Sequence, residues 1–141
     1  MTRRELILAG LAAAHGGGYT SVQVQKLFFL LDRNIPKHTG GPHFNFAPYN
    51  YGPFDKELYV ELEALEADGL VAITPEHSWS VFSLTERGLA EGSKALNTLP
   101  TPVRQYMEQI SDFVRSLSFP QLVSAIYKAY PEMRENSVFK G

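Results

Sequence analysis

Apolar residues recur at helical spacing in the middle of the chain. Four of them step by four, four and three positions and so share one helix face: Phe54, Leu58, Leu62 and Leu65. Asp55 falls in the expected first turn, where a carboxylate meets the positive end of the helix dipole. Gly69 supplies a C-terminal stop. The pattern predicts a helix over residues 54–68.

The same periodicity predicts two earlier helices, at residues 3–14 and 21–34. Glycines 16–18 end the first, because three glycines lose too much backbone entropy to continue a helix. Thr20 or Ser21 then caps the second. Its apolar stripe is Val24, Leu27, Phe28, Leu30 and Leu31, and Lys26 and Arg33 are expected off that stripe. A loop is expected from Pro36 to Pro42.

Alternating and β-branched residues predict a β-hairpin at residues 71–84, with Trp79, Val81 and Ser83 on one face. A weaker alternation, Phe44-Asn45-Phe46, allows a short strand. Three helices followed by a hairpin is the winged-helix order. Three more helices are expected: one capped by Thr85, one over 103–117, and one from Ser118 to Tyr130.

The predicted fold class is therefore mainly α with a small β-hairpin. Residues 1–100 form a winged-helix-like core, and residues 101–141 form a C-terminal helical extension packed on the same domain. The expected core includes Leu6, Leu27, Phe28, Leu31, Leu58, Leu62, Leu65, Val81, Ile110 and Ile126.

Composition agrees with a single globular domain, since the 141 residues are 44% hydrophobic and 20% charged. No apolar run is long enough to predict a membrane helix. The start superficially resembles a signal peptide, but Glu5 and His15 flank a short run with helical spacing, which favours a first helix. The absence of cysteine excludes disulfides and thiolate chemistry and weakly favours a cytoplasmic protein.

Catalytic and metal-binding patterns are missing from the sequence. The four histidines have no metal-ligand spacing, so no metal site is expected. No phosphate-binding loop, dinucleotide-binding glycine pattern or nucleophile elbow occurs. Two interpretations of the glycine run at 16–18 stay open, a phosphate site on the next helix and a flexible turn, and the turn is favoured. We expect no enzyme and no cofactor.

Charge is unevenly distributed along the chain. Residues 54–70 carry six acidic side chains against Lys56 alone, a local charge of −5, where a winged-helix DNA reader keeps basic residues. DNA binding by this helix is therefore disfavoured. The possible nucleic-acid contacts are instead N-terminal: Arg3, Arg4 and Lys26.

A dense aromatic cluster precedes the acidic helix, and two interpretations stay open. The aromatic side chains either fold a long loop onto the core or anchor a protein partner. The candidate partner-binding residues are Phe44, Phe46, Tyr49, Tyr51, Phe54, Asp55 and Glu61. A long apolar stripe also predicts that residues 103–130 contribute to a homodimer.

Two motifs carry a resemblance to the Panacea-domain family, antitoxin-like proteins of bacteria and phages. Residues 25–30 (QKLFFL) resemble the family's Q-K-L segment in an early helix, and residues 49–54 (YNYGPF) resemble its aromatic-x-x-G-P turn. The resemblance covers about residues 3–90. Phe54 departs from the family's usual branched aliphatic residue, and tyrosines stand where a tryptophan is common.

The resemblance implies a small non-enzymatic protein that neutralises a toxin through protein–protein contact within a toxin–antitoxin system. Our favoured function is accordingly an antitoxin-like protein-binding module with a toxin-like partner. The alternative is a winged-helix transcriptional regulator that binds DNA.

Overall fold

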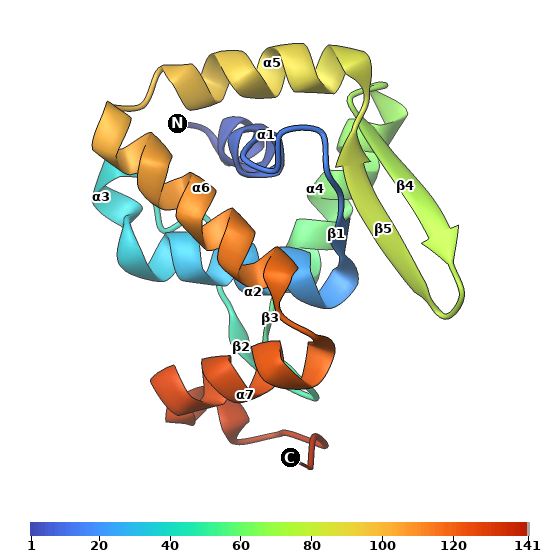
Figure 1. Cartoon of the computed structure of the whole chain (residues 1–141), viewed down its shortest axis with the longest axis vertical. Coiled ribbons are helices and arrows are strands. Elements are labelled where there is room, and N and C mark those ends of the chain that lie inside the picture. Colours follow the sequence, from blue (N-terminus) through green and yellow to red (C-terminus); the bar gives the residue numbers. More distant parts are fainter. Residues whose placement is uncertain (141) are drawn as a thin grey trace.

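Helices and a small antiparallel sheet form the core of the computed structural model, which describes residues 1–140 (Figure 1). The core helices are α1 (Arg3–Ala12), α2 (Ser21–Asn34) and α4 (Lys56–Ala67). The strands are β1 (Tyr19–Thr20), β4 (Val71–Glu76) and β5 (Trp79–Leu84). They pair in the order β1-β5-β4. The predicted fold class is confirmed, and this element order is that of a winged helix.

Side-chain caps explain where the core helices begin. Thr20 and Gln23 form a capping box at the start of α2, as Thr2 and Glu5 do for α1. Asp55 is the N-cap of α4, and its Oδ1 accepts the Glu57 N–H at 2.9 Å. The helix therefore begins one residue after Asp55, and the prediction that it starts at Phe54 is wrong.

Phe54 instead ends a short strand. Strand β3 (Gly52–Phe54) pairs with β2 (Ala47–Tyr49) in a second small sheet. The turn between them uses Gly52 at φ 106°, a conformation that glycine adopts without steric cost. The possible strand at Phe44–Phe46 is wrong, because pairing begins only at Ala47.

The predicted loop after α2 contains the short helix α3 (Pro36–Thr39). Pro36 at its first position has a backbone angle suited to a helix start, and Gly40 at φ 75° ends it. Proline and glycine here mark the start and the end of a short helix, and the prediction of a loop without helix is wrong for residues 36–39.

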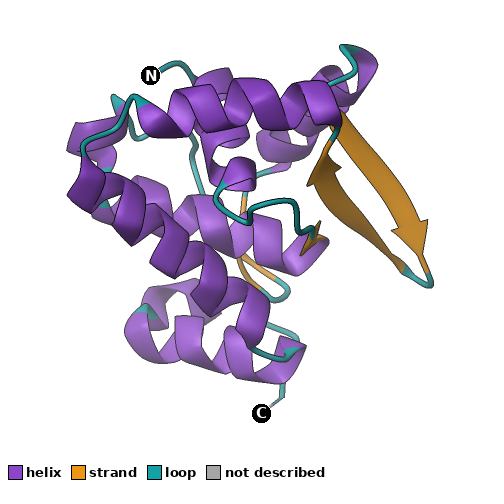
Figure 2. Cartoon of the chain, turned by 45° about the horizontal axis from the view of Figure 1, so that its top comes forward, coloured by secondary structure: helices purple, strands orange, loops and turns teal. Residues whose placement is uncertain are grey.

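The hairpin of β4 and β5 projects away from the helices as the wing (Figure 2). The sequence predicted that this hairpin exists, but it did not predict which face of the hairpin is buried. Phe82 is buried and stacks on Tyr59, with ring centroids 5.8 Å apart. Val81 is only half-buried and lies on the opposite face, against the backbone of Gly18. The prediction of Val81 as a core residue is wrong.

The prediction of a core position is confirmed for most of the other residues. The fully buried ones are Leu6, Leu27, Phe28, Leu31, Leu58, Leu62, Leu65 and Ile126. Ile110 is only partly buried, although it packs against this core.

Three further helices follow the wing, as predicted. They are α5 (Glu86–Asn97), α6 (Thr101–Ser116) and α7 (Phe119–Ala129), and a 3-10 turn η1 (Pro131–Arg134) ends the helical part. In Figure 1, α5 runs over α1 and α6 crosses α2. Gly92 makes the first contact possible, because a Cβ at this position would lie 2.5 Å from the Leu8 carbonyl oxygen.

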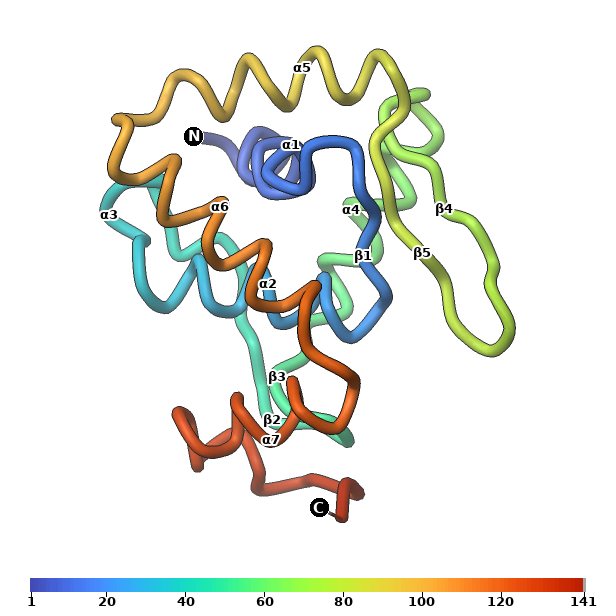
Figure 3. The backbone as a smooth tube through the Cα atoms, viewed as in Figure 1, coloured from blue at the N-terminus to red at the C-terminus, as the bar shows by residue number. Residues whose placement is uncertain are grey.

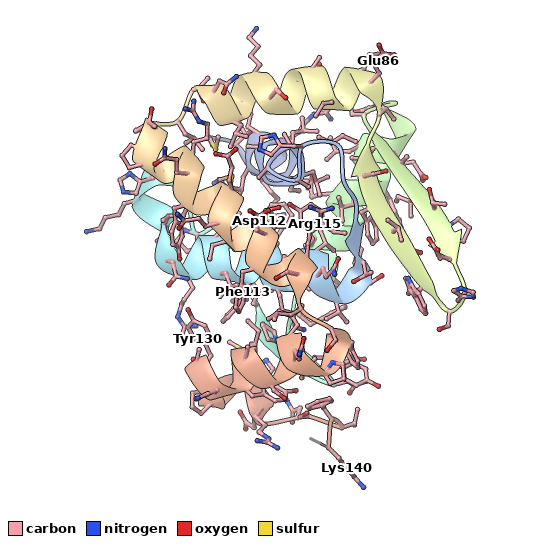
Figure 4. The ribbon with its side chains drawn as sticks, in the orientation of Figure 1. Glu86, Asp112, Phe113, Arg115, Tyr130 and Lys140 are labelled. Carbon is pink, nitrogen blue, oxygen red and sulfur yellow. The ribbon has the colours of Figure 1, made fainter. Side chains whose placement is uncertain are left out.

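Polar contacts tie α6 to the core. Tyr19 donates to the Gly10 carbonyl at 2.9 Å and pairs with Ser111 Oγ at 2.5 Å. Burial raises the pKa of the Tyr19 phenol to about 12. Arg115, labelled in Figure 4, reaches back from α6 to donate its Nε–H to the Gly18 carbonyl at 3.1 Å.

Most of the apolar stripe of α6 faces this core, including Val103, Met107 and Val114. Phe113 is 40% exposed. The stripe is therefore largely used within the chain, and the homodimer stays a prediction, as does the domain division at residue 100.

Residues 136–138 lie beside the β2–β3 turn, and the tube in Figure 3 shows the C-terminal segment on this side of the molecule. Val138 donates its N–H to the Asn50 carbonyl at 2.9 Å, and Asn136 Nδ2 donates to the Pro48 carbonyl at 3.3 Å. Across residues 1–140 no helix combines the length and the apolar character needed to cross a membrane.

Candidate partner-binding groove

An open groove of about 490 Å³ lies where the wing, the start of α2 and the α6–α7 junction meet. We call it the aromatic groove. Its walls are mostly apolar and its lining residues are Thr20, Ser21, Val22, Gln23, Tyr51, Ser78, Trp79, Leu117, Phe119 and Leu122. Its three aromatic side chains are substantially exposed: Tyr51 at 41%, Phe119 at 43% and Trp79 at 45%.

Local structure places these three rings. Tyr51 occupies the β2–β3 turn and meets Phe119 edge-on, with ring centroids 5.1 Å apart. Phe119 is the first residue of α7, directly after its N-cap Ser118. Trp79 opens β5 at the tip of the wing, where its ring lies 5.2 Å from that of His77. Phe119 also meets the Phe139 ring, with centroids 6.0 Å apart, and all three rings remain partly exposed.

Two smaller pockets adjoin the aromatic groove, and Ser21 lines all three. The first, the Tyr59 pocket, has a volume of about 270 Å³ and includes Glu63 of α4 and Phe82 of β5. The second, the Lys26 pocket, has a volume of about 180 Å³ and shares Val22 and Tyr51 with the groove. The three hollows together surround the first turn of α2.

Lys26 is 3% exposed, so the expectation that it lies off the buried stripe of α2 is wrong. Burial lowers the pKa of its ammonium group from the ordinary value of 10.5 to about 7. Its Nζ lies beside Gly52, where an added Cβ would be 3.4 Å away. Because its ammonium group is buried, Lys26 does not belong to an exposed basic surface that could follow a nucleic-acid backbone.

Gln25 joins the two motifs that carry the family resemblance. Its Nε2 donates to the Asp55 carbonyl and its Oε1 accepts the Asp55 N–H, both at 3.0 Å. This reciprocal pair fixes the start of α4 against α2. Together with the approach of Lys26 to Gly52, it brings residues 25–30 and 49–54 into direct contact.

The other two candidate nucleic-acid contacts are engaged within the chain. Arg3 donates to the His43 carbonyl at 2.6 and 2.9 Å, and its guanidinium lies 4.8 Å above the Phe44 ring and 3.8 Å from Glu61. Arg4 pairs with Asp68 at 2.6 Å. Both arginines therefore pair with carboxylates of the acidic segment at residues 54–70 and partly neutralise its negative charge.

The predicted aromatic partner surface divides into two parts. Phe44 is buried and contacts Phe28, with ring centroids 6.1 Å apart, and half-buried Phe46 packs edge-on against Phe29. For these two rings the core interpretation fits. Tyr49 is 51% exposed and stacks on half-buried Phe54, and it lies near Tyr51 at the hairpin turn.

The two acidic candidates have structural partners. The Asp55 carboxylate caps α4 and also accepts the Asn45 N–H at 2.7 Å. Glu61 is half-buried beside Arg3. The freely exposed carboxylates of α4 are instead Glu57, Glu63 and Glu66.

Within the described part of the chain, no group of three His, Asp or Glu side chains is arranged to hold a metal ion. His15 Nε2 lies 2.6 Å from Glu108, and His43 Nε2 lies 2.7 Å from the Thr39 carbonyl. The His43 loop is anchored by buried Asp32, which accepts the N–H groups of His43 and Phe44. Burial raises the pKa of Asp32, although these hydrogen bonds oppose the shift.

No protein-family model matches the chain, and no curated protein sequence matches it. The resemblance to the Panacea domain therefore stays a prediction.

Sequence reasoning missed most of the groove. Trp79 and Phe119 lie far from Tyr51 in sequence and meet it only through the fold. A single tryptophan placed beside a predicted turn was the one signal available for the wing. Nothing in the spacing of residues 117–122 distinguishes groove-lining side chains from buried ones.

Proposed function

We propose that this chain is a non-enzymatic protein-binding module, and that its aromatic groove receives an apolar segment of a partner protein. The observation that carries this is the convergence of Tyr51, Trp79 and Phe119, all more than 40% exposed, on one groove. Aromatic residues in concave sites are typical anchors of protein interfaces. Isolated exposed apolar residues would need no such explanation.

The charges beside the groove favour a partner with a basic flank. Glu63 lines the adjoining Tyr59 pocket, and Glu57 and Glu66 are exposed on the same helix. Carboxylates at the rim of an interface steer and orient a partner of opposite charge more than they add affinity. We therefore expect lysine or arginine in the part of the partner that faces α4.

The antitoxin role rests on the resemblance of residues 25–30 and 49–54 to the Panacea domain. In this proposal the partner is a toxin-like protein, both proteins are cytoplasmic, and neutralisation requires contact rather than catalysis. Co-expression with a toxic product of an adjacent gene tests the role: restored growth that is lost in Tyr51→Ala and Trp79→Ala variants supports it. Restored growth that is insensitive to both substitutions contradicts it.

Peptide display tests the binding function without knowledge of the partner. A library of internal peptides is selected on the parent protein and counter-selected on the Tyr51→Ala/Trp79→Ala double variant. We expect the selection to enrich peptides that contain aliphatic or aromatic residues. The enriched peptides should still bind a Val60→Ala control, since Val60 is 52% exposed on α4 and does not line the groove. Equal recovery on the parent and the double variant would contradict the proposal.

The DNA-binding alternative is favoured by the winged-helix order of the core. Against it, α4 exposes Glu57, Glu63 and Glu66, Lys26 is buried, and Arg3 and Arg4 are paired. A steeply salt-dependent mobility shift on the protein's own promoter would establish the regulator in place of the binding module.

A further inference from the structure

Among the described residues, Lys26 has no oppositely charged partner in the Lys26 pocket. Its walls come from the start of α2, the β2–β3 hairpin and Tyr59, and they include no carboxylate among the described residues. None of the ion pairs formed within residues 1–140 involves Lys26. A buried lysine is normally paired, because removing an ammonium group from water is costly. The missing counter-charge points to something that enters from outside.

The titratable side chains near Lys26 are neutral phenols, and the nearby charged side chains have other partners. The titratable groups around the pocket are the phenols of Tyr49, Tyr51 and Tyr59. The Tyr127 ring of α7 approaches the same side of Gly52 as Lys26 Nζ does, because a Cβ at Gly52 would lie 3.4 Å from each of them. The Asp55 carboxylate is used by the N–H groups of Glu57 and Asn45, and the Arg134 guanidinium lies over the Tyr127 ring. Burial is therefore the cause of the lowered Lys26 pKa, with no carboxylate to offset it.

A second feature of the pocket also favours an anion. Ser21 and Val22 line it, and they belong to the first turn of the 14-residue helix α2. Backbone N–H groups in a first helical turn lack intrahelical acceptors, and the helix dipole places positive charge there. Lys26 and the first turn of α2 thus line the same small pocket, and both favour a negative charge there.

We propose that the Lys26 pocket binds the side-chain carboxylate of an aspartate or glutamate in the partner segment that lies in the aromatic groove. The inference rests on the proposed function, because Val22 and Tyr51 line both the pocket and the groove and so make them continuous. The aromatic walls fit a single carboxylate on a short aliphatic stem. The absence of a side chain at Gly52 allows Lys26 Nζ to lie close to the backbone of the β2–β3 hairpin.

The pairing has a measurable effect on proton affinity. An opposite charge within a few ångströms raises a lysine pKa by about 1 to 3. The carboxylate then binds the protonated amine in preference, so its affinity falls as pH rises above 7. We expect binding to be roughly tenfold or more weaker at pH 9 than at pH 6.

The test follows the lysine 13Cε NMR signals of the full chain during pH titration. The probe is the blocked dipeptide acetyl-phenylalanyl-aspartate amide, whose only carboxylate is the side chain, and its asparagine counterpart is the neutral control. We expect the aspartate peptide alone to raise the Lys26 titration midpoint and Lys26→Met to abolish its binding. Lys56→Met, which removes an exposed charge from α4, should leave binding unchanged.

Three results would overturn the inference. One is no response of Lys26 to the aspartate peptide at tens of millimolar. Another is an equal response to the asparagine peptide. The third is a larger response to inorganic phosphate, or to a peptide whose only carboxylate is its C-terminus. If Lys26→Met leaves the affinity for groove-selected peptides unchanged while Trp79→Ala lowers it, this inference fails and the proposed function stands. If Lys26→Met lowers the affinity while Trp79→Ala leaves it unchanged, Lys26 binds the peptide and the proposed role of the aromatic groove fails.

Discussion

Replacing Lys26 with Met should stabilise the free protein. Methionine nearly matches the shape of the lysine stem but carries no charge to desolvate. The Lys26 pKa falls from 10.5 to about 7 on folding, and each tenfold change in proton affinity corresponds to about 1.4 kcal/mol. The penalty that the substitution removes is therefore on the order of 5 kcal/mol at pH 6.

The pH dependence makes this prediction specific. The unfolded chain holds the Lys26 proton up to about pH 10.5, whereas the folded chain releases it near pH 7. The parent protein therefore gains stability between these values, and the Met variant lacks that gain. The difference between them should shrink from about 5 kcal/mol at pH 6 to about 1 kcal/mol at pH 9.5.

Urea unfolding of both proteins across this pH range, in buffers without carboxylates, measures the difference. Lys56→Met controls for the loss of one exposed positive charge. A Met variant that is less stable than the parent at pH 6 would refute the reasoning. So would a difference that does not change with pH.

Three further predictions concern stability and packing. Gln25→Ala should cost about 1–3 kcal/mol in the free energy of unfolding, because it leaves the N–H and carbonyl of Asp55 without their reciprocal partner; urea denaturation checks this. Gly92→Ala should lower the melting temperature, with a cost of about 1–3 kcal/mol, because its Cβ would meet the Leu8 carbonyl oxygen at 2.5 Å; calorimetry that finds no change would contradict the close α1–α5 packing. Tyr51→Ala should cost on the order of 1 kcal/mol in the free energy of unfolding, because it removes the edge-on contact with Phe119 from a ring that is 41% exposed; the variant stays folded, so that any loss of binding reports on the groove itself.

Sequence periodicity was sufficient for most helices and for the wing, because each of these elements has a clear apolar face or alternation. It was insufficient at Phe54, where an aromatic residue that matched the helical spacing belongs to a strand instead. It also chose the wrong face of β5. Trp79, Val81 and Ser83 alternate as well as Ser80, Phe82 and Leu84 do, and only packing against Tyr59 decides that Phe82 points inward.

The site was harder to predict than the fold. A lysine one position from an apolar stripe normally keeps its ammonium group in water, and no local pattern shows that the β2–β3 hairpin will cover Lys26. The charges of Arg3 and Arg4 similarly suggested a free basic surface, because their pairing with the acidic helix links residues far apart in sequence. Tyr49 and Tyr51 were predicted as surface candidates, but the Trp79 and Phe119 walls needed the fold.

The most direct test of the account is the affinity of a groove-selected peptide for single variants of the folded protein. Fluorescence anisotropy would compare the parent with Tyr51→Ala, Trp79→Ala and the exposed control Val60→Ala. Loss of an interface anchor costs more than about 1.4 kcal/mol, so each groove variant should bind at least roughly tenfold more weakly, while the control stays within about twofold. Equal affinities for all four proteins would contradict the claim that the aromatic groove binds the partner.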